Sequence, residues 1–286
     1  MLTPAISFVL LFIMSKIENN ITEIQKRSQS HFSSCAFYYQ KGHILKNTED
    51  LEKTFEDIKL EKGMKALDIA TGNGYTAFFL AEHGLDVTAC DITENMLEGA
   101  KKTAIEKNYD IKFVLHSAEK LPYPNESFDL VCCRYAAHHF GDQKAFVRES
   151  ARVLKKDGLF VLIDGTVPNG EWEAYEWLDR VEKLRDFSHV GYRFESEWKE
   201  YCREAGLEPV KSLFIPFKQD DIEWYFRSGG TSVENQQAIY KLVQEASEKV
   251  KKVLKVGWED GKPVWWWIKL ALVARKTLPA PKENSE

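Results

Sequence analysis

The chain has 286 residues, of which 44% are hydrophobic and 29% are charged, and its formal net charge is −5. This composition is typical of a soluble globular protein, and the length accommodates one domain with insertions. The negative charge balance argues against a nucleic-acid-binding surface, so no DNA or RNA partner is expected. Five cysteines stand at positions 35, 90, 132, 133 and 202. Their odd number and their spacing predict neither a disulfide framework nor a metal site.

The chain begins with an apolar stretch, residues 6–14, that is too short to span a bilayer as a helix. A signal peptide would need basic residues before this stretch and a small-residue cleavage site after it, and the sequence has neither. We expect residues 1–15 to be an N-terminal extension without stable membrane insertion; contact with a membrane surface is the alternative. A helical lid and lead is predicted at 16–60, and a cytoplasmic location is expected.

The most informative segment is residues 64–74, MKALDIATGNG. Its first part predicts a buried strand, and Gly72 and Gly74 predict a sharp turn into a helix at 75–83. A strand, a glycine turn and a helix N-terminus can hold a nucleoside-bearing cofactor, although the turn can also be only a tight connection. Asp68 stands just before the turn. A carboxylate there disfavours a pyrophosphate and favours a cationic ligand.

A second predicted strand, residues 86–91, ends at another acid, Asp91. It follows the turn by about 20 residues, the spacing at which a carboxylate meets ribose hydroxyls on the neighbouring strand. The alternative role for Asp91 is an N-cap for the helix predicted at 93–107. That cap is weak, because Thr93 followed by Met96 makes only half of a capping box.

The next segments carry a family resemblance. Strands are predicted at 111–116 and 128–133, and residues 30–165 resemble class I S-adenosylmethionine-dependent methyltransferases of the small-molecule type. They are similar to the methyltransferases of menaquinone and ubiquinone biosynthesis. The matching pieces are LDIATGNG (67–74), VTACD (87–91), SAEKLPY (117–123), SFD (127–129), AHHF (137–140) and RVLKKDG (152–158). Each piece is weak alone, so the resemblance rests on their shared order and spacing.

The resemblance implies that S-adenosylmethionine is the cofactor and that it lies over the glycine turn. The residues it places around the methionine and sugar are Asp68, Ala70, Gly72, Asn73 and Gly74, with Asp91 at the ribose. The residues it places around the adenine are Ile92, Met96, Ser117, Ala118 and Glu119, with Arg134 under the cofactor through its backbone. The family often has Asp at the position of Ser117, and a hydroxyl can still accept a hydrogen bond from the adenine amino group.

The run 31–39 resembles the lid that covers the cofactor in this family. Phe32, Ala36 and Tyr39 stand at its characteristic positions. For Tyr39, a place on an amphipathic packing helix is an equal alternative.

The fold class that follows is α/β. We expect a Rossmann-like seven-stranded sheet, mostly parallel with an antiparallel last strand, with helices on both faces. The remaining strands are predicted at 159–164, 208–216 and 264–275, and helices at 142–156 and 195–205. The methyltransferase domain would cover residues 61–276, with a helical insertion at about 217–262 that holds a long charged helix near 232–256. The tail, residues 277–286, is expected to be disordered.

Methyl transfer needs few catalytic side chains, because the sulfonium already activates the methyl group and alignment supplies much of the rest. A base is needed only when the nucleophile must lose a proton. His138 and His139 follow the fourth strand, where ligands meet open α/β sheets. We expect His138 to face the substrate and His139 to pack or contact the cofactor; alternatively both are structural. His189, in the run LRDFSHV (184–190), is a second candidate acid or base.

Four aromatic residues lie near this second run: Trp172, Tyr175, Trp177 and Tyr192. They suggest a flat or apolar acceptor, such as a quinone-like ring or an isoprenoid, or they form core under a long connection. The leading hypothesis is therefore transfer of a methyl group from S-adenosylmethionine to a small-molecule acceptor, at an O, C or N nucleophile, by in-line displacement. The alternatives are a nicotinamide-dependent oxidoreductase, which Asp68 disfavours, and a non-catalytic binding protein of the same fold. A homodimer stays open.

Overall fold

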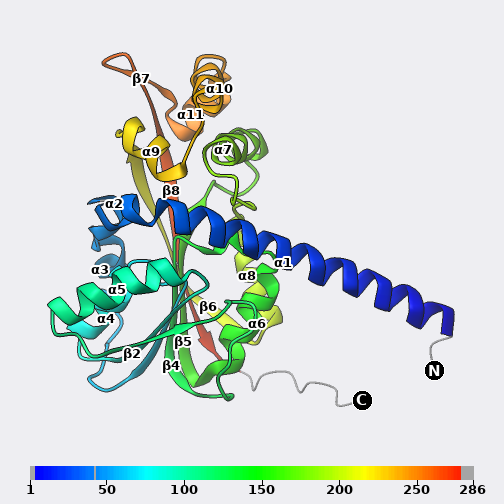
Figure 1. Cartoon of the computed structure of the whole chain (residues 1–286), viewed down its shortest axis with the longest axis vertical. Helices are drawn as coiled ribbons and strands as arrows, with labels where there is room; N and C mark the ends of the chain where they lie inside the picture. Colours follow the sequence, from blue (N-terminus) through cyan, green and yellow to red (C-terminus); the bar gives the residue numbers. More distant parts are fainter. Residues whose placement is uncertain (1–3, 42, 278–286) are drawn as a thin grey trace.

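The computed structural model describes residues 4–41 and 43–277, which are built around one twisted sheet (Figure 1). Within these residues, seven strands follow the order β3-β2-β1-β4-β5-β8-β6, and a short β7 pairs with β8 outside this path. The strands are β1 (Lys65–Ile69), β2 (Asp86–Asp91), β3 (Ile111–Leu115), β4 (Phe128–Arg134), β5 (Leu154–Thr166), β6 (Leu207–Gln219), β7 (Gly257–Glu259) and β8 (Lys262–Lys276). Strands β1 to β5 pair in parallel, whereas β8 is antiparallel to both β5 and β6. The expected sheet is confirmed.

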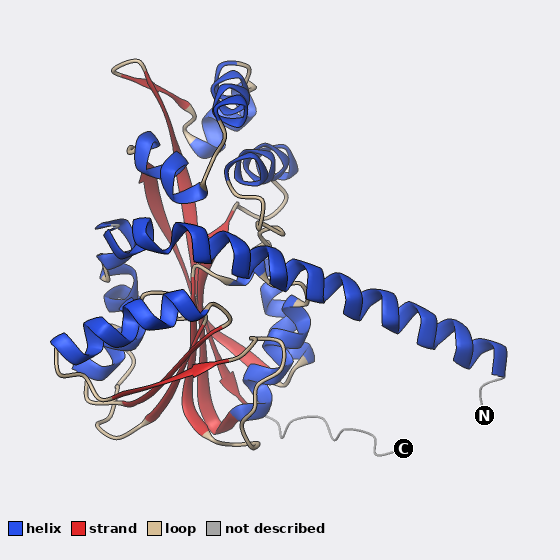
Figure 2. Cartoon of the chain, viewed as in Figure 1, coloured by secondary structure: helices blue, strands red, loops and turns tan. Residues whose placement is uncertain are grey.

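Helices cover both faces of the sheet (Figure 2). They are α1 (Pro4–Lys41), α2 (His43–Lys46), α3 (Glu49–Phe55), α4 (Tyr75–Glu82), α5 (Glu94–Glu106), α6 (Gln143–Val153), α7 (Trp172–Arg185), α8 (Glu195–Glu204), α9 (Ile222–Gly229), α10 (Val233–Gln244), α11 (Glu248–Leu254) and a 3-10 turn, η1 (Ala137–His139). Helices α3, α4 and α5 lie on one side, and α6 and α8 on the other (Figure 1). Covering both faces buries the central strand β4, where Leu130 to Cys133 are at most 1% exposed.

Strands β6 and β8 continue beyond the end of β5. The last β5 residue, Thr166, pairs with Ile268, while β6 stays paired with β8 as far as Gln219 and Trp265. Helices α7, α9, α10 and α11 pack around this extension, and Tyr225 and Trp265 are fully buried in the core they form. In Figure 1 this upper part stands above the rest of the sheet, and α1 crosses between the two.

Three sequence-based boundaries differ from the structure. The helix expected at 142–156 ends at Val153, because Leu154 pairs with Phe128 and joins β5. The insertion begins later than residue 217, because β6 runs to Gln219. The long helix expected at 232–256 is two helices, since Ser247 starts α11 by accepting a hydrogen bond from the Val250 amide at 3.2 Å.

Helix α1 passes through the boundary expected at 15/16 without a break, and α1 to α3 make up the expected helical lead. Residues 1–3 of the expected extension and all of the expected tail except Thr277 lie outside the described residues. Among the helices that the structure describes, none is long and apolar enough to cross a membrane.

Candidate active site

The glycine turn after β1 has the backbone that its sequence predicts. Ala70, Gly72 and Gly74 all have positive φ, at 54°, 53° and 87°. Gly74 is the N-cap of α4, and a Cβ there would meet the Phe78 ring at 2.7 Å. The turn therefore needs glycine at position 74 for both conformation and space.

Asp68 lies behind this turn. The resemblance implied a place beside the cofactor, but Asp68 is not among the residues that line the pocket above the turn. Its carboxylate accepts a hydrogen bond from the Thr71 hydroxyl at 2.6 Å, and the residue is 1% exposed. Burial raises the pKa of Asp68 to about 7. The side chain fixes the turn from below, and the cavity wall is made instead by Thr71 and Gly72.

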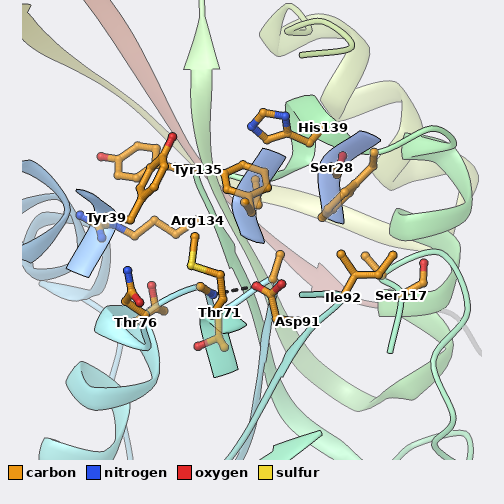
Figure 3. A pocket seen from close by; sticks show the side chains of 18 of the residues that line it. Ser28, Tyr39, Thr71, Thr76, Asp91, Ile92, Ser117, Arg134, Tyr135 and His139 are labelled. Atoms are coloured by element: carbon orange, nitrogen blue, oxygen red, sulfur yellow. Dashed lines mark hydrogen bonds between the residues drawn. The ribbon is translucent and has the colours of Figure 1, made fainter. Parts of the chain in front are cut away.

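Asp91 lies where β2 ends and reaches across to the turn (Figure 3). One carboxylate oxygen accepts a hydrogen bond from the Gly72 amide at 2.9 Å, and the other accepts one from the Thr93 amide at 2.8 Å. Thr93, and not Asp91, is the N-cap of α5. Burial raises the pKa of Asp91. Each carboxylate oxygen keeps a lone pair, so Asp91 can still accept from ligand hydroxyls.

A first pocket opens above these residues and encloses about 980 Å³ of space, part of it open to solvent. Most of the cofactor residues expected from the sequence line it: Tyr39, Ala70, Gly72, Asn73, Asp91, Ile92, Met96, Ser117, Ala118, Glu119, Arg134 and His139. Asp68 and Gly74 do not. Figure 3 shows Ile92 and Ser117 at one end of the pocket and Tyr39 and Tyr135 at the other. The structure adds lining residues that sequence reasoning missed, among them Gln25, Ser28 and Tyr135.

Helix α1 closes one end of this first pocket. The Gln25 amide donates to Ser117 Oγ at 3.1 Å and to Glu119 Oε2 at 2.8 Å. The other Glu119 oxygen accepts from the Gly141 amide at 3.0 Å. Three segments that are far apart in the sequence thus meet at the position expected for the adenine.

S-adenosylmethionine fits the chemistry of this pocket. Asn73 is 7% exposed, and both its side-chain oxygen and nitrogen lack a hydrogen-bond partner among the described residues. Ser28 Oγ on the covering helix is in the same condition. A ligand with hydroxyl, amino and carboxylate groups would satisfy these atoms, which are otherwise costly to bury.

The side chain of Arg134 is committed to the protein, which leaves its backbone for the expected place under the cofactor. It pairs with buried Asp50 of α3, with Nη2 and Oδ1 3.0 Å apart. It also donates to the carbonyl oxygens of Leu45 at 3.0 Å and Asn47 at 2.7 Å. The side chain therefore fastens α2 and α3 to the end of β4 and only forms part of the pocket wall.

A second pocket of about 700 Å³ adjoins the first. The two share the side chains of Phe32, Tyr39, Leu45, Tyr135 and His139. The residues that line the second pocket alone are His138, Asp164, Gly165, Arg185, Tyr192, Phe217, Trp224, Trp267 and Lys269. They come from η1 after β4, from β5, from the end of α7 and the connection after it, and from β6, α9 and β8.

His138 lies in this second pocket and is held by Asp164 at the end of β5. His138 Nδ1 is 2.6 Å from Asp164 Oδ1, and the His138 amide donates to the other carboxylate oxygen at 2.9 Å. Burial opposes protonation, yet the Asp164 carboxylate outweighs it, so the pKa of His138 lies above its ordinary value. Because Nδ1 faces Asp164, Nε2 is the nitrogen left to act as base.

His139 faces both pockets but in another electrostatic state. Its Nδ1 is 3.1 Å from Ser188 Oγ, and its ring meets Phe32 of α1 edge-on. Burial holds the pKa of His139 well below its ordinary value. A neutral, packed imidazole agrees with the packing or cofactor-contact role expected for it.

His189 does not line either pocket. It is 4% exposed, and its Nε2 is 3.4 Å from Asp179 of α7. Its ring centroid lies 5.4 Å from that of His138. The expectation that His189 acts on the substrate is therefore not supported by its position.

Of the four aromatic residues singled out in the sequence, only Tyr192 lines a described pocket. Trp172 is 60% exposed, and Tyr175 and Trp177 belong to the core around α7.

Comparisons with known proteins agree with this geometry. Residues 67–162 match the family described as methyltransferase domain. The chain is 30% identical to the uncharacterized methyltransferase YcgJ of Bacillus subtilis over 250 residues, which are 86% of this chain and 97% of that protein. The crystal structure of YcgJ superposes with a TM-score of 0.74, covering 81% of this chain and 100% of YcgJ.

Two other proteins extend the comparison. The chain is 32% identical to the ubiquinone/menaquinone biosynthesis C-methyltransferase UbiE of Rickettsia akari, over 50% of this chain and 68% of that protein. At 14% identity, the geranyl diphosphate C-methyltransferase of Streptomyces coelicolor shares the fold, with a TM-score of 0.57 over 80% of this chain and 76% of that one. That structure contains S-adenosyl-L-homocysteine. With the sheet order, the glycine turn and the match to YcgJ in agreement, the chain belongs to the class I S-adenosylmethionine-dependent methyltransferases.

Proposed function

We propose that this enzyme transfers a methyl group from S-adenosylmethionine in the first pocket to a small molecule in the second, with His138 as the base. One observation carries the proposal: the two pockets share five side chains, and the His138–Asp164 pair lies on the far side of that shared wall. A donor and an acceptor bound in adjoining cavities are held in contact, which supplies much of the rate acceleration for a displacement.

In this proposal, each part of the first pocket has its own task. Asp91 accepts hydrogen bonds from the ribose hydroxyls while it keeps the turn in place through Gly72. Asn73 binds the polar end of the methionine. Ser117 and Glu119, held by Gln25, bind the adenine. Tyr39 and Phe32 of α1 separate the bound groups from water, because α1 covers both pockets.

When bound, S-adenosylmethionine supplies a methyl group on a positively charged sulfur, so an electron pair of the acceptor forms the new bond as the sulfur takes the electrons of the old one. His138 Nε2 takes the proton that an O–H, N–H or C–H acceptor loses. Asp164 stabilises the imidazolium that forms and fixes its orientation, which is the usual second partner of a catalytic histidine. The released proton passes from His138 to solvent after the acceptor leaves.

The lining of the second pocket supports a flat acceptor with apolar faces. Tyr39, Tyr135, Tyr192, Phe217, Trp224 and Trp267 present aromatic surface there. Gly165 leaves room for the Tyr192 ring, because a Cβ at position 165 would overlap that ring at 2.3 Å. A quinone-like ring or another conjugated small molecule fits such a lining, and the net charge of −5 does not favour a nucleic acid.

Calorimetry with S-adenosylhomocysteine and with NAD tests the cofactor. We expect micromolar-range affinity for the first and none for the second, and the opposite result would revive the oxidoreductase hypothesis. Turnover is tested by released S-adenosylhomocysteine in a metabolite extract, followed by a search for products heavier by one methyl group. The His138→Gln variant should keep cofactor affinity and lose turnover. Equal turnover in that variant would exclude His138 as the base, and no turnover in the wild type would favour a non-catalytic binding protein.

A further inference from the structure

The second pocket contains an excess positive charge. The charged side chains that line it, besides the two histidines, are Asp164, Arg185 and Lys269. Asp164 is engaged by His138 at 2.6 Å. The remaining two residues, Arg185 and Lys269, are cations, and how far the protein neutralises each of them indicates what the pocket can bind.

Arg185 is satisfied within the protein. Its Nε donates to the Tyr225 carbonyl at 3.1 Å, and Nη2 donates to Ser228 Oγ at 2.9 Å and to the Tyr39 hydroxyl at 3.3 Å. Its Nη1 stands 3.6 Å from the buried carboxylate of Glu182. Arg185 therefore has a counter-charge of its own and several acceptors.

Lys269 shares its counter-charge with Arg134. The nearest carboxylate is Asp50 Oδ2 at 3.6 Å, which is longer than a hydrogen bond. Asp50 already accepts three hydrogen bonds of 3.1 to 3.3 Å from Arg134 and another from the Tyr135 hydroxyl. Asp50, Arg134 and Lys269 together carry one net positive charge. In the described part of the chain, Lys269 Nζ has no hydrogen-bond acceptor.

The surroundings hold this ammonium group at the pocket wall. Nζ lies 4.2 Å from the Phe217 ring centroid and 5.0 Å from that of Tyr135. Lys269 follows Trp267 by two residues on β8, so both side chains are on the same face of the strand. Desolvation lowers the pKa of Lys269 to about 8, against the attraction of Asp50 and with a contribution from Arg134, and the charged form still dominates at neutral pH. A buried cation needs a partner, and here the aromatic walls supply only part of one.

We propose that the methyl acceptor is a flat conjugated acid whose anionic oxygen, a carboxylate or phenolate, binds Lys269. Lys269 is then a specificity-determining residue that selects anionic over neutral acceptors of the same shape. The inference rests on the proposed function only in naming the occupant of the second pocket as the methyl acceptor. It also agrees with the charge of the donor, since an anion beside a sulfonium is attracted to it.

Matched aromatic probes test this selection. The affinities of 2-naphthoate and of 2-naphthamide, its neutral isostere, are measured by calorimetry with and without S-adenosylhomocysteine. The naphthoate should bind about tenfold to a hundredfold more tightly, the range for a hydrogen bond to a buried charge. Lys269→Met should abolish this preference, and Lys269→Arg should keep it. Lys262→Met is the matched control, because Lys262 lies on the same strand, is 58% exposed and pairs with Glu223 outside the pocket.

Each outcome bears on one proposal. Equal affinities in the wild type, no binding of either probe, or an unchanged preference in Lys269→Met would overturn the role of Lys269. S-adenosylhomocysteine titrations of the same variants report whether the first pocket is intact, so a misfolded Lys269→Met would be recognised. In that case Lys269→Arg tests the proposal, because loss of the naphthoate preference in that variant would overturn it. Absent S-adenosylhomocysteine binding with preserved naphthoate selection would instead overturn the proposed function alone.

Discussion

Replacing Asp164 by Asn tests how the second pocket prepares His138. The substitution keeps the shape of the side chain but removes its charge and one of its two acceptor oxygens. The charge-assisted bond to Nδ1, at 2.6 Å, should weaken by about 1–1.5 kcal/mol when its acceptor becomes neutral. An amide has one oxygen, so the bond from the His138 amide, at 2.9 Å, is also lost, for about 1 kcal/mol more.

These two losses affect different measurements. Only the first depends on the charge of His138, so kcat should fall roughly 5- to 13-fold. Both reduce the free energy of unfolding, by about 2–2.5 kcal/mol, when His138 is protonated. Because the pKa of His138 is raised in the folded protein, the first part is present at acid pH and disappears as the pH rises through that raised pKa. About 1 kcal/mol of the destabilisation should remain at alkaline pH.

The direct assay is an NMR titration of the imidazole protons, which needs no acceptor. The chain has seven histidines, and His138→Gln identifies the resonance of His138. In the wild type the pKa of His138 should lie above 6.5, its ordinary value. In Asp164→Asn the pKa should be lower, since burial is then opposed only by the charges of Glu182 and Asp186. Identical titration curves in the two proteins, or a wild-type midpoint below 6.5, would refute the reasoning.

Two further predictions concern the cofactor pocket and its support. Asp91→Ala should weaken S-adenosylhomocysteine binding by about 1–3 kcal/mol in calorimetry, while exposed Asp86→Ala on the same strand should not; unchanged affinity would leave Asp91 only its bonds to the turn and to the start of α5. Arg134→Met should lower the unfolding free energy in urea by about 3–5 kcal/mol, because it leaves the Asp50 carboxylate buried without its main partner. Arg148→Met, at an exposed position, is its control. A loss below about 1 kcal/mol in Arg134→Met would contradict the role of Arg134 in holding α2 and α3 to the end of β4.

The cofactor half of the site could be predicted because its residues lie close together in the sequence. The turn at 70–74, Asp91 and residues 117–119 each follow directly from a strand of the parallel sheet. The carboxyl ends of such strands meet at one edge, so strand order alone brings these residues together. Asp68 is not among the lining residues of the first pocket, and its carboxylate accepts a hydrogen bond from Thr71, so a direct contact with the cofactor stays a prediction.

The acceptor half could not be predicted in the same way. Asp164 and Lys269 read as ordinary strand residues. Asp164 reaches His138 because β5 runs parallel beside β4, and Lys269 joins the same pocket because β8 runs antiparallel beside β5. Phe217 and Trp267 become a pocket wall because β6 and β8 continue past the end of β5. No local sequence pattern predicts where a strand ends, since its length depends on the strands with which it pairs. His189 shows the opposite case. Its motif indicated a place beside the substrate, but in the structure its imidazole lies beside Asp179 and lines neither pocket.

The sequence by itself determined the fold class, through local periodicity and the glycine turn, and it indicated the cofactor through the family resemblance of its motifs. The tertiary structure decided which histidine has a carboxylate behind it and which lysine must share one. Those properties depend on side chains that are far apart in the sequence, such as Asp50 and Lys269, and that only the pairing of the strands brings together, where burial makes an incompletely neutralised charge costly.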